Sequence, residues 1–306
     1  MKATRDIAHD IVKHHFGKSP KDTLKIARGL ANYVFEVLVD HQPYIIRIAS
    51  ETAKLQYFQK EQWAVEKARE LKIPVPEILE VGNEASSLPY MIVKKIEGEY
   101  AETHAKRIDI VWEMGKYAAL IHKIPTIGYG HVFDWSSNLL SKNETWADFL
   151  EKELEMTKRI SLLAEHKIYS ASELSNLQSV LSSIGKSGMK TCLNHGDLRL
   201  KNMLLNDKGK ICGILDWENA MSNFGPVWDI GIALHDLTID EKEAFLEGYG
   251  MTPHEYRKNC EGVKALNILN YVPYLEMAYK SKKRSVIENI KQRLYGELDL
   301  YSLEMK

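Results

Sequence analysis

The chain has 306 residues and a formal net charge of −1, and 44% of its residues are hydrophobic while 27% are charged, which describes an ordinary globular protein of one or two domains. The near-neutral charge gives no reason to expect nucleic acid or a membrane as a partner. Three dispersed cysteines, the lack of a long apolar run and an N-terminal segment without a signal-peptide core predict a cytoplasmic protein, which we expect to be a monomer or a weak dimer.

The N-terminal third predicts an antiparallel sheet accompanied by helices. A first helix is expected over residues 4–15, and a longer one over about residues 52–71, ending before a proline-containing segment. The predicted strands are five short runs rich in apolar and β-branched residues: TLKIA, YVFEVLVD, YIIRIAS, EILEVG and YMIVKKI. Residues 41–43 are expected to join the second and third strands as a hairpin.

From about Gly98 onward helical patterns dominate the sequence. Helices are expected over residues 108–123, 145–166 and 171–183 and over most of the chain from residue 240. The only convincing strand signal in this part is MLLNDKGKICGILDW, two short apolar runs around a turn. The pattern predicts an α+β protein with two lobes, residues 1–95 and 96–306.

The stretch LNHGDLRLKN places His195, Asp197 and Asn202 in one predicted loop, and Asp216 follows Asp197 by nineteen positions, at the end of the apolar run ICGIL. An aspartate can accept the proton of a hydroxyl nucleophile, while carboxylate and amide oxygens are ligands that Mg²⁺ prefers. This division of labour is typical of kinase phosphoryl transfer. Taken singly, each residue is equally compatible with a turn cap, and His195 with a loop brace; the ordered set favours the chemistry.

The ordered set resembles the catalytic loop of the aminoglycoside phosphotransferase family, protein-kinase-like enzymes that phosphorylate small molecules. The resemblance implies that Asp197 is the catalytic base, that Asn202 and Asp216 hold Mg²⁺, and that Asp229 helps to hold the loop containing His195. It also implies a bilobal kinase-like fold, in which a five-stranded lobe binds the nucleotide and a helical lobe carries the catalytic loop and the acceptor pocket. Four segments resemble hygromycin B phosphotransferases in particular: YIIRIAS, LKIPVPEILEVGN, TWADFL and LDWENAMSNFG.

A buried ion pair is predicted in the N-terminal third. Arg47 is the only charge inside the apolar run YIIRIAS, and Glu61 falls on the apolar stripe of the helix that follows. Because a buried carboxylate is costly unless it is paired, we expect Arg47 and Glu61 to pair beside the nucleotide phosphates. In the alternative, Glu61 is exposed and Glu66 or Glu51 takes its place.

The other nucleotide contacts are implied by the resemblance. The backbone amides of Ala31 and Asn32, in a turn with a single glycine, are expected to contact phosphate, and Val93, Lys94 and Ile96 to contact the purine of ATP or GTP. A plain turn and a plain buried strand are the alternatives.

Glu218 and Trp217 are the leading candidates for binding the acceptor, because carboxylates bind cationic aminoglycosides and aromatic faces bind quaternary amines. Further candidates are Trp135, Trp146, Tyr271, Tyr274 and Glu276. The last three lie in NYVPYLEMAYK, which is equally an amphipathic helix interrupted at Pro273.

Three hypotheses for function follow. The first is a kinase that transfers the γ-phosphate of a nucleoside triphosphate to a hydroxyl of an aminoglycoside-like antibiotic. The second is a metabolic kinase of the same fold, acting on choline, homoserine, a thioribose or another sugar. The third is a catalytically dead nucleotide-binding module. The simultaneous presence of Asp197, Asn202 and Asp216 disfavours the third, and the hygromycin-like segments favour the first.

Overall fold

The computed structural model describes residues 5–26, 32–131 and 142–300, with side chains up to residue 295. The chain forms two compact units, one made of Met1–His104 with Lys201–Ala220 and the other of Ala105–Leu200 with Met221–Lys306. The lobes expected at 1–95 and 96–306 follow chain order, whereas these units do not. The difference arises because strand β6 (Glu99–Tyr100) pairs with strand β8 (Met203–Leu205), which joins the hairpin to the first unit.

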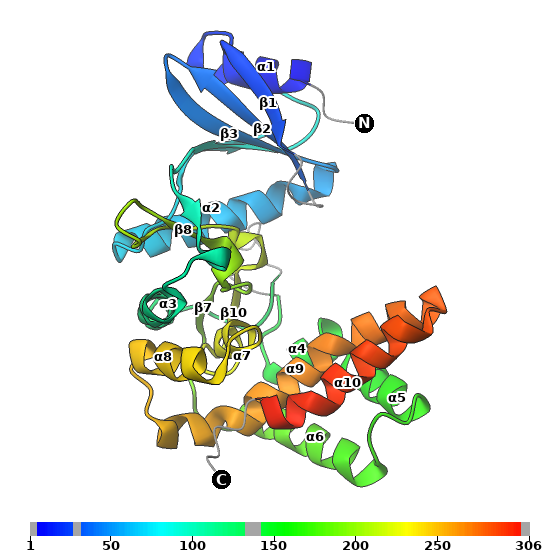
Figure 1. The fold of residues 1–306 in the computed structure, drawn as a ribbon. Helices are drawn as coiled ribbons and strands as arrows, with labels where there is room; N and C mark the ends of the chain where they lie inside the picture. The colour runs from blue at the N-terminus through cyan, green and yellow to red at the C-terminus, as the bar shows by residue number, and fades with distance from the viewer. Residues whose placement is uncertain (1–4, 27–31, 132–141, 301–306) are drawn as a thin grey trace. The chain divides into compact units, whose positions relative to one another are not determined.

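The first unit contains the expected five-stranded antiparallel sheet, in the order β1-β2-β3-β5-β4 (Figure 1). Its strands are β1 (Asp22–Ile26), β2 (Asn32–Val39), β3 (Gln42–Ala49), β4 (Glu77–Gly82) and β5 (Tyr90–Lys94). The β2–β3 turn lies one residue earlier than expected, at Asp40 and His41, which both have positive φ angles of 48° and 65°. Two such residues form the turn that matches the right-handed twist of a hairpin.

The two faces of this sheet have different surroundings. Helix α1 (Arg5–Phe16) covers one face, where alternate residues of the central strands are buried against it: Phe35, Val37, Ile46, Ile48 and Ile92. The residues between them, including Ile45 and Arg47, face the other side because side chains alternate along a strand. At that side helix α2 (Leu55–Glu70), preceded by the 3₁₀ turn η1 (Thr52–Lys54), packs Phe58 against Met91.

The hairpin of the first unit consists of β8 and β9 (Ile211–Ile214), and it extends β6 into a three-stranded sheet. Short 3₁₀ turns flank these strands: η2 (Ala101–Thr103), η4 (Leu200–Asn202) and η5 (Trp217–Asn219). Lys60 of α2 is almost fully buried and donates a hydrogen bond of 2.7 Å to the carbonyl oxygen of Glu218. This bond fixes η5 on α2.

Where the structure describes it, the second unit is mainly helical and contains a short strand pair, β7 (Cys192–Asn194) with β10 (Met221–Asn223), which the sequence did not predict. Its helices are α3 (Arg107–Ile121), α4 (Trp146–Lys152), α5 (Met156–Glu165), α6 (Ala171–Ile184), α7 (Asp229–Leu234), α8 (Ile239–Tyr249), α9 (Pro253–Ser281) and α10 (Arg284–Leu300). The long helices α9 and α10 lie side by side (Figure 1, orange and red). No helix in the described ranges is long and apolar enough to cross a membrane.

The single helix predicted over residues 145–166 is wrong, because α4 and α5 are separate helices. Glu155, the N-cap of α5, has a left-handed conformation with φ 47°, so one helix cannot run through this position. Just before it, Glu153 accepts hydrogen bonds from the backbone N–H of His131 at 2.9 Å and from the Asn143 amide at 2.7 Å. Contacts with residues distant in sequence therefore decide where the helix breaks.

In the alternative given for NYVPYLEMAYK, a helix is interrupted at Pro273, but α9 continues through this proline. A proline inside a helix lacks the N–H that would bond the carbonyl four residues earlier, here that of Leu269. Arg159 of α5 supplies the missing donor, because its Nη1 lies 3.0 Å from the Leu269 oxygen. A side chain from a neighbouring helix thus makes the proline tolerable.

Helices α3 and α8 approach each other closely at two glycines. A Cβ atom at Gly115 would overlap the carbonyl oxygen of Phe245, and one at Gly248 would overlap that of Trp112. The absence of side chains at these positions lets the two backbones meet. This contact fixes α8 on α3 within the second unit.

Candidate active site

A cavity of about 560 Å³ lies on the face of the sheet that α1 leaves uncovered, within the first unit. Its volume is in the range of small-molecule and cofactor pockets, about 300–1,000 Å³. Strands β2, β3 and β5, helix α2 and the hairpin supply its walls. These walls include ten residues that the sequence singled out: Asn32, Arg47, Glu61, Val93, Lys94, Ile96, Asn202, Asp216, Trp217 and Glu218.

Arg47 and Glu61 form the predicted ion pair at the wall of this cavity, which confirms the pair. Arg47 Nη1 donates to Glu61 Oε1, and the two side chains are only 16% and 5% exposed. Burial lowers the pKa of Arg47, but Glu61, Asp216 and Glu218 outweigh it and raise that pKa overall, so the guanidinium stays charged. Glu61 Oε2 is buried and has no hydrogen-bond partner within the described ranges.

Asn202 and Asp216 lie next to each other at the start and end of the hairpin. The backbone N–H of Leu215 donates to the carbonyl oxygen of Asn202 at 2.8 Å, which ties the two positions together. Asp216 has φ 66° and ψ 60°, a left-handed conformation that aspartate tolerates better than most residues and that often occurs at functional sites. Both residues border the cavity.

The chemistry of this pair fits Mg²⁺ held jointly with a nucleotide. Among the described residues there is no group of three or more His, Cys, Asp or Glu that could hold a metal by itself. Mg²⁺ is commonly bound by one or two protein oxygen ligands with substrate phosphates and water. A carboxylate and an amide on a cavity wall with a cation opposite match that arrangement.

Glu218 belongs to the same cluster. Its Oε2 accepts a hydrogen bond of 3.3 Å from the Asn32 amide and lies 3.5 Å from Arg47 Nη2. Burial and the neighbouring charge of Asp216 raise the pKa of the Glu218 carboxyl. The Asn32 Oδ1 atom is buried without a hydrogen-bond partner among described residues, so the cluster retains an acceptor atom beside the cavity.

Trp217 differs from its expected place in an acceptor pocket. The whole residue is 0% exposed, and its indole N–H donates to the carbonyl oxygen of Ile214 at 2.9 Å. Trp217 borders the cavity described above, but its full burial makes it a packing residue of the cavity wall and leaves no exposed side-chain surface for an acceptor. Two other candidates, Ala31 and Trp135, lie outside the described residues.

In the second unit, Asp229 holds the loop that contains Asp197, as the resemblance implied. Its carboxylate is fully buried and accepts the backbone N–H groups of His195 at 2.6 Å and Gly196 at 2.8 Å. The backbone N–H of Asp197 in turn donates to His195 Nδ1 at 3.2 Å. His195 is completely buried, and this geometry makes it a brace for the loop.

Two residues near Asp197, Arg199 and Asp236, were not predicted as site residues. Arg199 Nε donates to Asp197 Oδ1 at 2.5 Å, and Arg199 Nη1 lies 3.4 Å from Asp236 Oδ2. An arginine two positions after the acid in the otherwise apolar run DLRL was the available signal for Arg199. No local pattern pointed to Asp236, which follows α7.

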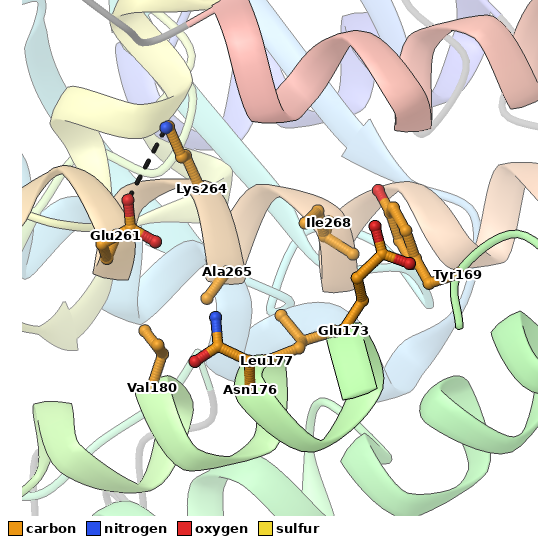
Figure 2. Close-up of a pocket in the computed structure, with 9 residues that line it drawn as sticks. All are labelled: Tyr169, Glu173, Asn176, Leu177, Val180, Glu261, Lys264, Ala265 and Ile268. Atoms are coloured by element: carbon orange, nitrogen blue, oxygen red, sulfur yellow. Dashed lines mark ion pairs between the residues drawn. The ribbon is translucent and has the colours of Figure 1, made fainter. Parts of the chain in front are cut away.

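A second, smaller pocket lies between α6 and α9 in the second unit (Figure 2). Tyr169, Leu177 and Ile268 line it, together with an ion pair between Lys264 and Glu261 at 3.6 Å. Its volume of about 70 Å³ holds a few water molecules at most. It contains none of the expected site residues.

The sheet, the buried Arg47–Glu61 pair and the braced HGD loop are typical of protein-kinase-like phosphotransferases. The particular family follows from sequence comparison. A profile of the Phosphotransferase enzyme family, APH, matches residues 22–262, and the chain belongs to this family. The predicted family, enzyme class and bilobal α+β fold are thereby confirmed.

The named relatives include two kinases. Amicoumacin kinase of Bacillus subtilis (strain 168) is 26% identical over 249 residues, which cover 75% of this chain and 69% of that protein. Hygromycin-B 4-O-kinase of Escherichia coli is 23% identical over 218 residues, covering 66% of this chain and 59% of that protein. The matched region thus spans less than two thirds of the hygromycin enzyme.

Solved structures show the same fold. One is a thermostable mutant of aminoglycoside phosphotransferase APH(4)-Ia in ternary complex with AMP-PNP and hygromycin B. It superimposes with a TM-score of 0.68 at 16% identity, over 97% of this chain and 99% of that chain. At this identity the likeness establishes the fold alone.

Proposed function

We propose that this protein transfers the γ-phosphate of ATP or GTP to a hydroxyl of an aminoglycoside-like antibiotic in the cytoplasm. The observation that carries the proposal is the cavity whose walls combine a buried arginine–glutamate pair with the amide of Asn202 and the carboxylate of Asp216. The Arg47 guanidinium suits the phosphates of a nucleotide, and the oxygens of Asn202 and Asp216 suit a divalent cation. The two named relatives with the highest coverage of their own length are antibiotic kinases.

In this proposal Arg47 binds phosphate oxygens, and Glu61 fixes its guanidinium. Arginine suits this task because its planar fork bonds two oxygens at once and keeps its charge. Val93, Lys94 and Ile96, at the end of β5, border the same cavity and contact the purine. Asn32 contacts phosphate from the start of β2.

Asn202 and Asp216 hold Mg²⁺, which neutralises charge on the phosphates when it is bound. Asp197 accepts the proton of the acceptor hydroxyl as the hydroxyl oxygen attacks the γ-phosphorus, while the bond from that phosphorus to the β–γ bridging oxygen breaks and the nucleoside diphosphate leaves. Asp229 and His195 keep the loop of Asp197 in one conformation. Glu218, which is one third exposed and contacts Arg47, binds an amine of the acceptor.

The test is a Mg²⁺-dependent phosphorylation screen with ATP and GTP. The acceptors are hygromycin B, amicoumacin and kanamycin on one side, and choline, homoserine, methylthioribose and simple sugars on the other. We expect transfer to an antibiotic hydroxyl. Turnover only with the second group would replace the proposal with a metabolic kinase, and the absence of both turnover and nucleotide binding would indicate an inactive interaction module.

Asp197→Asn tests the base directly. This variant should abolish transfer while its nucleotide affinity, measured by calorimetry, stays near that of the wild type. Asp207→Asn, on the exposed turn of the hairpin, is the matched control and should remain fully active. An Asp197→Asn variant that transfers phosphate at the wild-type rate would refute the assignment.

A further inference from the structure

Helix α7 contacts the HGD loop through an aspartate at each end. Asp229, its first residue, accepts the backbone N–H groups of His195 and Gly196. Asp236, two residues after its last, pairs with Arg199, which in turn holds Asp197. Seven residues of helix span about 10 Å. The loop is therefore held at two separated points, one through its backbone and the other through the Arg199 side chain.

Asp236 is itself fixed to α9. His235 Nδ1 lies 2.9 Å from Asp236 Oδ1, and the other ring nitrogen of His235 hydrogen bonds with the hydroxyl of Tyr271. One turn earlier on each helix, the Asn267 amide donates to the carbonyl oxygen of Gly231 at 3.3 Å. These two contacts, spaced four residues apart on both helices, attach α7 to α9.

The charges along this path keep their signs at neutral pH. The hydrogen bond from His235, together with the charges of His235 and Arg199, lowers the pKa of Asp236 to about 2 despite partial burial. Burial lowers the pKa of Arg199, but its ion pairs with Asp197 and Asp236 raise it overall. Arg199 is thus a permanent cation between two carboxylates.

The ion pair between Arg199 and Asp236 contributes little to the stability of the fold. Asp197 is only 9% exposed, whereas in the ion pair between Arg199 and Asp236 the side chains are 35% and 58% exposed, and an ion pair this exposed contributes little to folding. Its geometry has a different consequence, because the guanidinium fork bonds the two carboxylates through different nitrogens. Fixing Asp236 on α9 therefore fixes where the Asp197 carboxylate lies.

We propose that Arg199 is a positioning residue for phosphoryl transfer, which holds the Asp197 carboxylate where it accepts the proton of the acceptor hydroxyl. The inference rests on the proposed function, in which Asp197 is the base. Arg199 acts through Asp197, while Asp236, His235 and Tyr271 act through Arg199. The arginine takes no part in proton or phosphate transfer itself.

The expected effect of Arg199→Ala is a fall in kcat. A displacement of a reacting group by about 1 Å costs on the order of 100-fold in rate, so we expect kcat to fall about 30- to 100-fold. The KM and Kd for nucleotide should change by no more than about twofold, because Arg199 does not line the nucleotide cavity. Arg199→Lys should retain part of the rate, and Asp236→Ala should fall between Arg199→Ala and the wild type.

Chemical rescue provides a readout that a purely structural role would not move. Millimolar guanidinium ion should raise the rate of Arg199→Ala, since it can occupy the vacated site between the two carboxylates. Rates are measured with the nucleotide and acceptor found in the screen, and also with MgATP and MgGTP alone, whose slow hydrolysis uses water as the acceptor.

Arg107→Ala is the matched control. Arg107 belongs to the same unit, is 34% exposed and donates to Glu241 at 2.6 Å, but lies outside the HGD loop. The Arg107→Ala variant loses a similar arginine–carboxylate pair. Its kcat should equal that of the wild type, and guanidinium ion should not change its rate.

Three results would overturn the proposal. The first is an Arg199→Ala variant with wild-type kcat, and the second is a loss that Arg107→Ala reproduces equally. The third is a rise in acceptor KM with kcat unchanged, which would make Arg199 a binding residue. A wild-type protein that neither binds nucleotide nor transfers phosphate would refute the proposed function. An active wild-type enzyme whose Arg199→Ala variant has the same kcat would refute only the role given to Arg199.

Discussion

The buried Arg47–Glu61 pair provides a test that separates stability from nucleotide binding. The perturbation is a set of three variants: Arg47→Met, Glu61→Leu, and both together. Each replacement keeps much of the side-chain volume while it removes the charge. Arg47 already packs over the ring of Phe58 at 5.5 Å, so an apolar replacement has a partner in the core between α2 and the sheet.

The two single variants should be strongly destabilised. Arg47→Met leaves the Glu61 carboxylate 5% exposed and without its cation, and Glu61 Oε2 is already buried without a partner among the described residues. Breaking a buried ion pair in this way costs about 3–5 kcal/mol. Glu61→Leu should cost somewhat less, on the order of 2 kcal/mol, because Arg47 keeps Glu218 at 3.5 Å.

The double variant should recover most of that loss. An apolar pair of similar volume commonly equals or exceeds a buried ion pair in stability, so its free energy of unfolding should lie within about 1 kcal/mol of the wild type. Its nucleotide affinity should not recover. A lost charged hydrogen bond is worth about 1.5–3 kcal/mol, which predicts a Kd about 10- to 150-fold higher.

Urea unfolding followed by tryptophan fluorescence measures the stabilities, with buried Trp217 as a reporter within the first unit. Calorimetry with ADP measures affinity, and the cycle of variants gives the coupling energy between the two side chains. A double variant as unstable as the sum of the single variants would refute the reasoning about buried charge. A double variant that binds ADP like the wild type would remove Arg47 from the nucleotide site.

Three further predictions concern the second unit. Arg159→Ala should cost about 1–3 kcal/mol of stability by leaving the Leu269 carbonyl without a donor, and Pro273→Ala should largely remove that cost because it restores the helical N–H. A full cost of Arg159→Ala in the Pro273→Ala background, measured by thermal unfolding, would show that the carbonyl is not the cause. Asp236→Asn should lower stability by about 1 kcal/mol after allowance for its exposure, and only above about pH 4. The native pKa of about 2 lies below the ordinary 3.8, so this stabilisation is lost as pH falls through that interval, and a difference that persists at pH 2 would contradict the sign. Gly115→Ala should destabilise by about 2 kcal/mol despite the better helix propensity of alanine, since its Cβ would overlap the backbone of α8; urea unfolding that shows a gain would refute the close packing.

Local sequence was sufficient for the sheet and for the cavity face of its central strand. In YIIRIAS the alternation of side chains places Arg47 opposite the core that contains Ile46 and Ile48, and the structure has this arrangement. The S/T-x-x-E pattern similarly marks helix starts, as at Ser170 and Thr238, where both capping boxes form. Such features follow from sequence because they depend on residues only a few positions apart.

The order of His195, Asp197, Asn202 and Asp216 likewise indicated the chemistry without coordinates. In a kinase-like site an aspartate can accept a proton, and amide and carboxylate oxygens can bind a cation. The hairpin predicted between Asn202 and Asp216 places these two residues at its two ends. The partner of Arg47 was also deducible, because an acid on an apolar helix stripe needs a cation.

Tertiary structure decided the features that depend on distant parts of the chain. Trp217 looked available for a ligand, but packing leaves it no exposed surface. The helix predicted over 145–166 breaks where Glu153 accepts a hydrogen bond from His131. Helix α9 continues through Pro273 because Arg159 donates to the Leu269 carbonyl that the proline leaves without a donor. In the two helices a local preference was overridden by a polar group that gained a partner far away in sequence.

The environment of Asp197 shows the same division. The stretch LNHGDLRLKN was sufficient to indicate an acid in an HGD loop. The side chains that hold this acid could not be predicted from the stretch. Arg199 and Asp236 are separated by 37 positions, and only folding brings the guanidinium to the second carboxylate. The sequence by itself determined which groups can do chemistry, and the tertiary structure decided which of them are exposed, paired and fixed, because burial and long-range hydrogen bonds are properties of the packed chain.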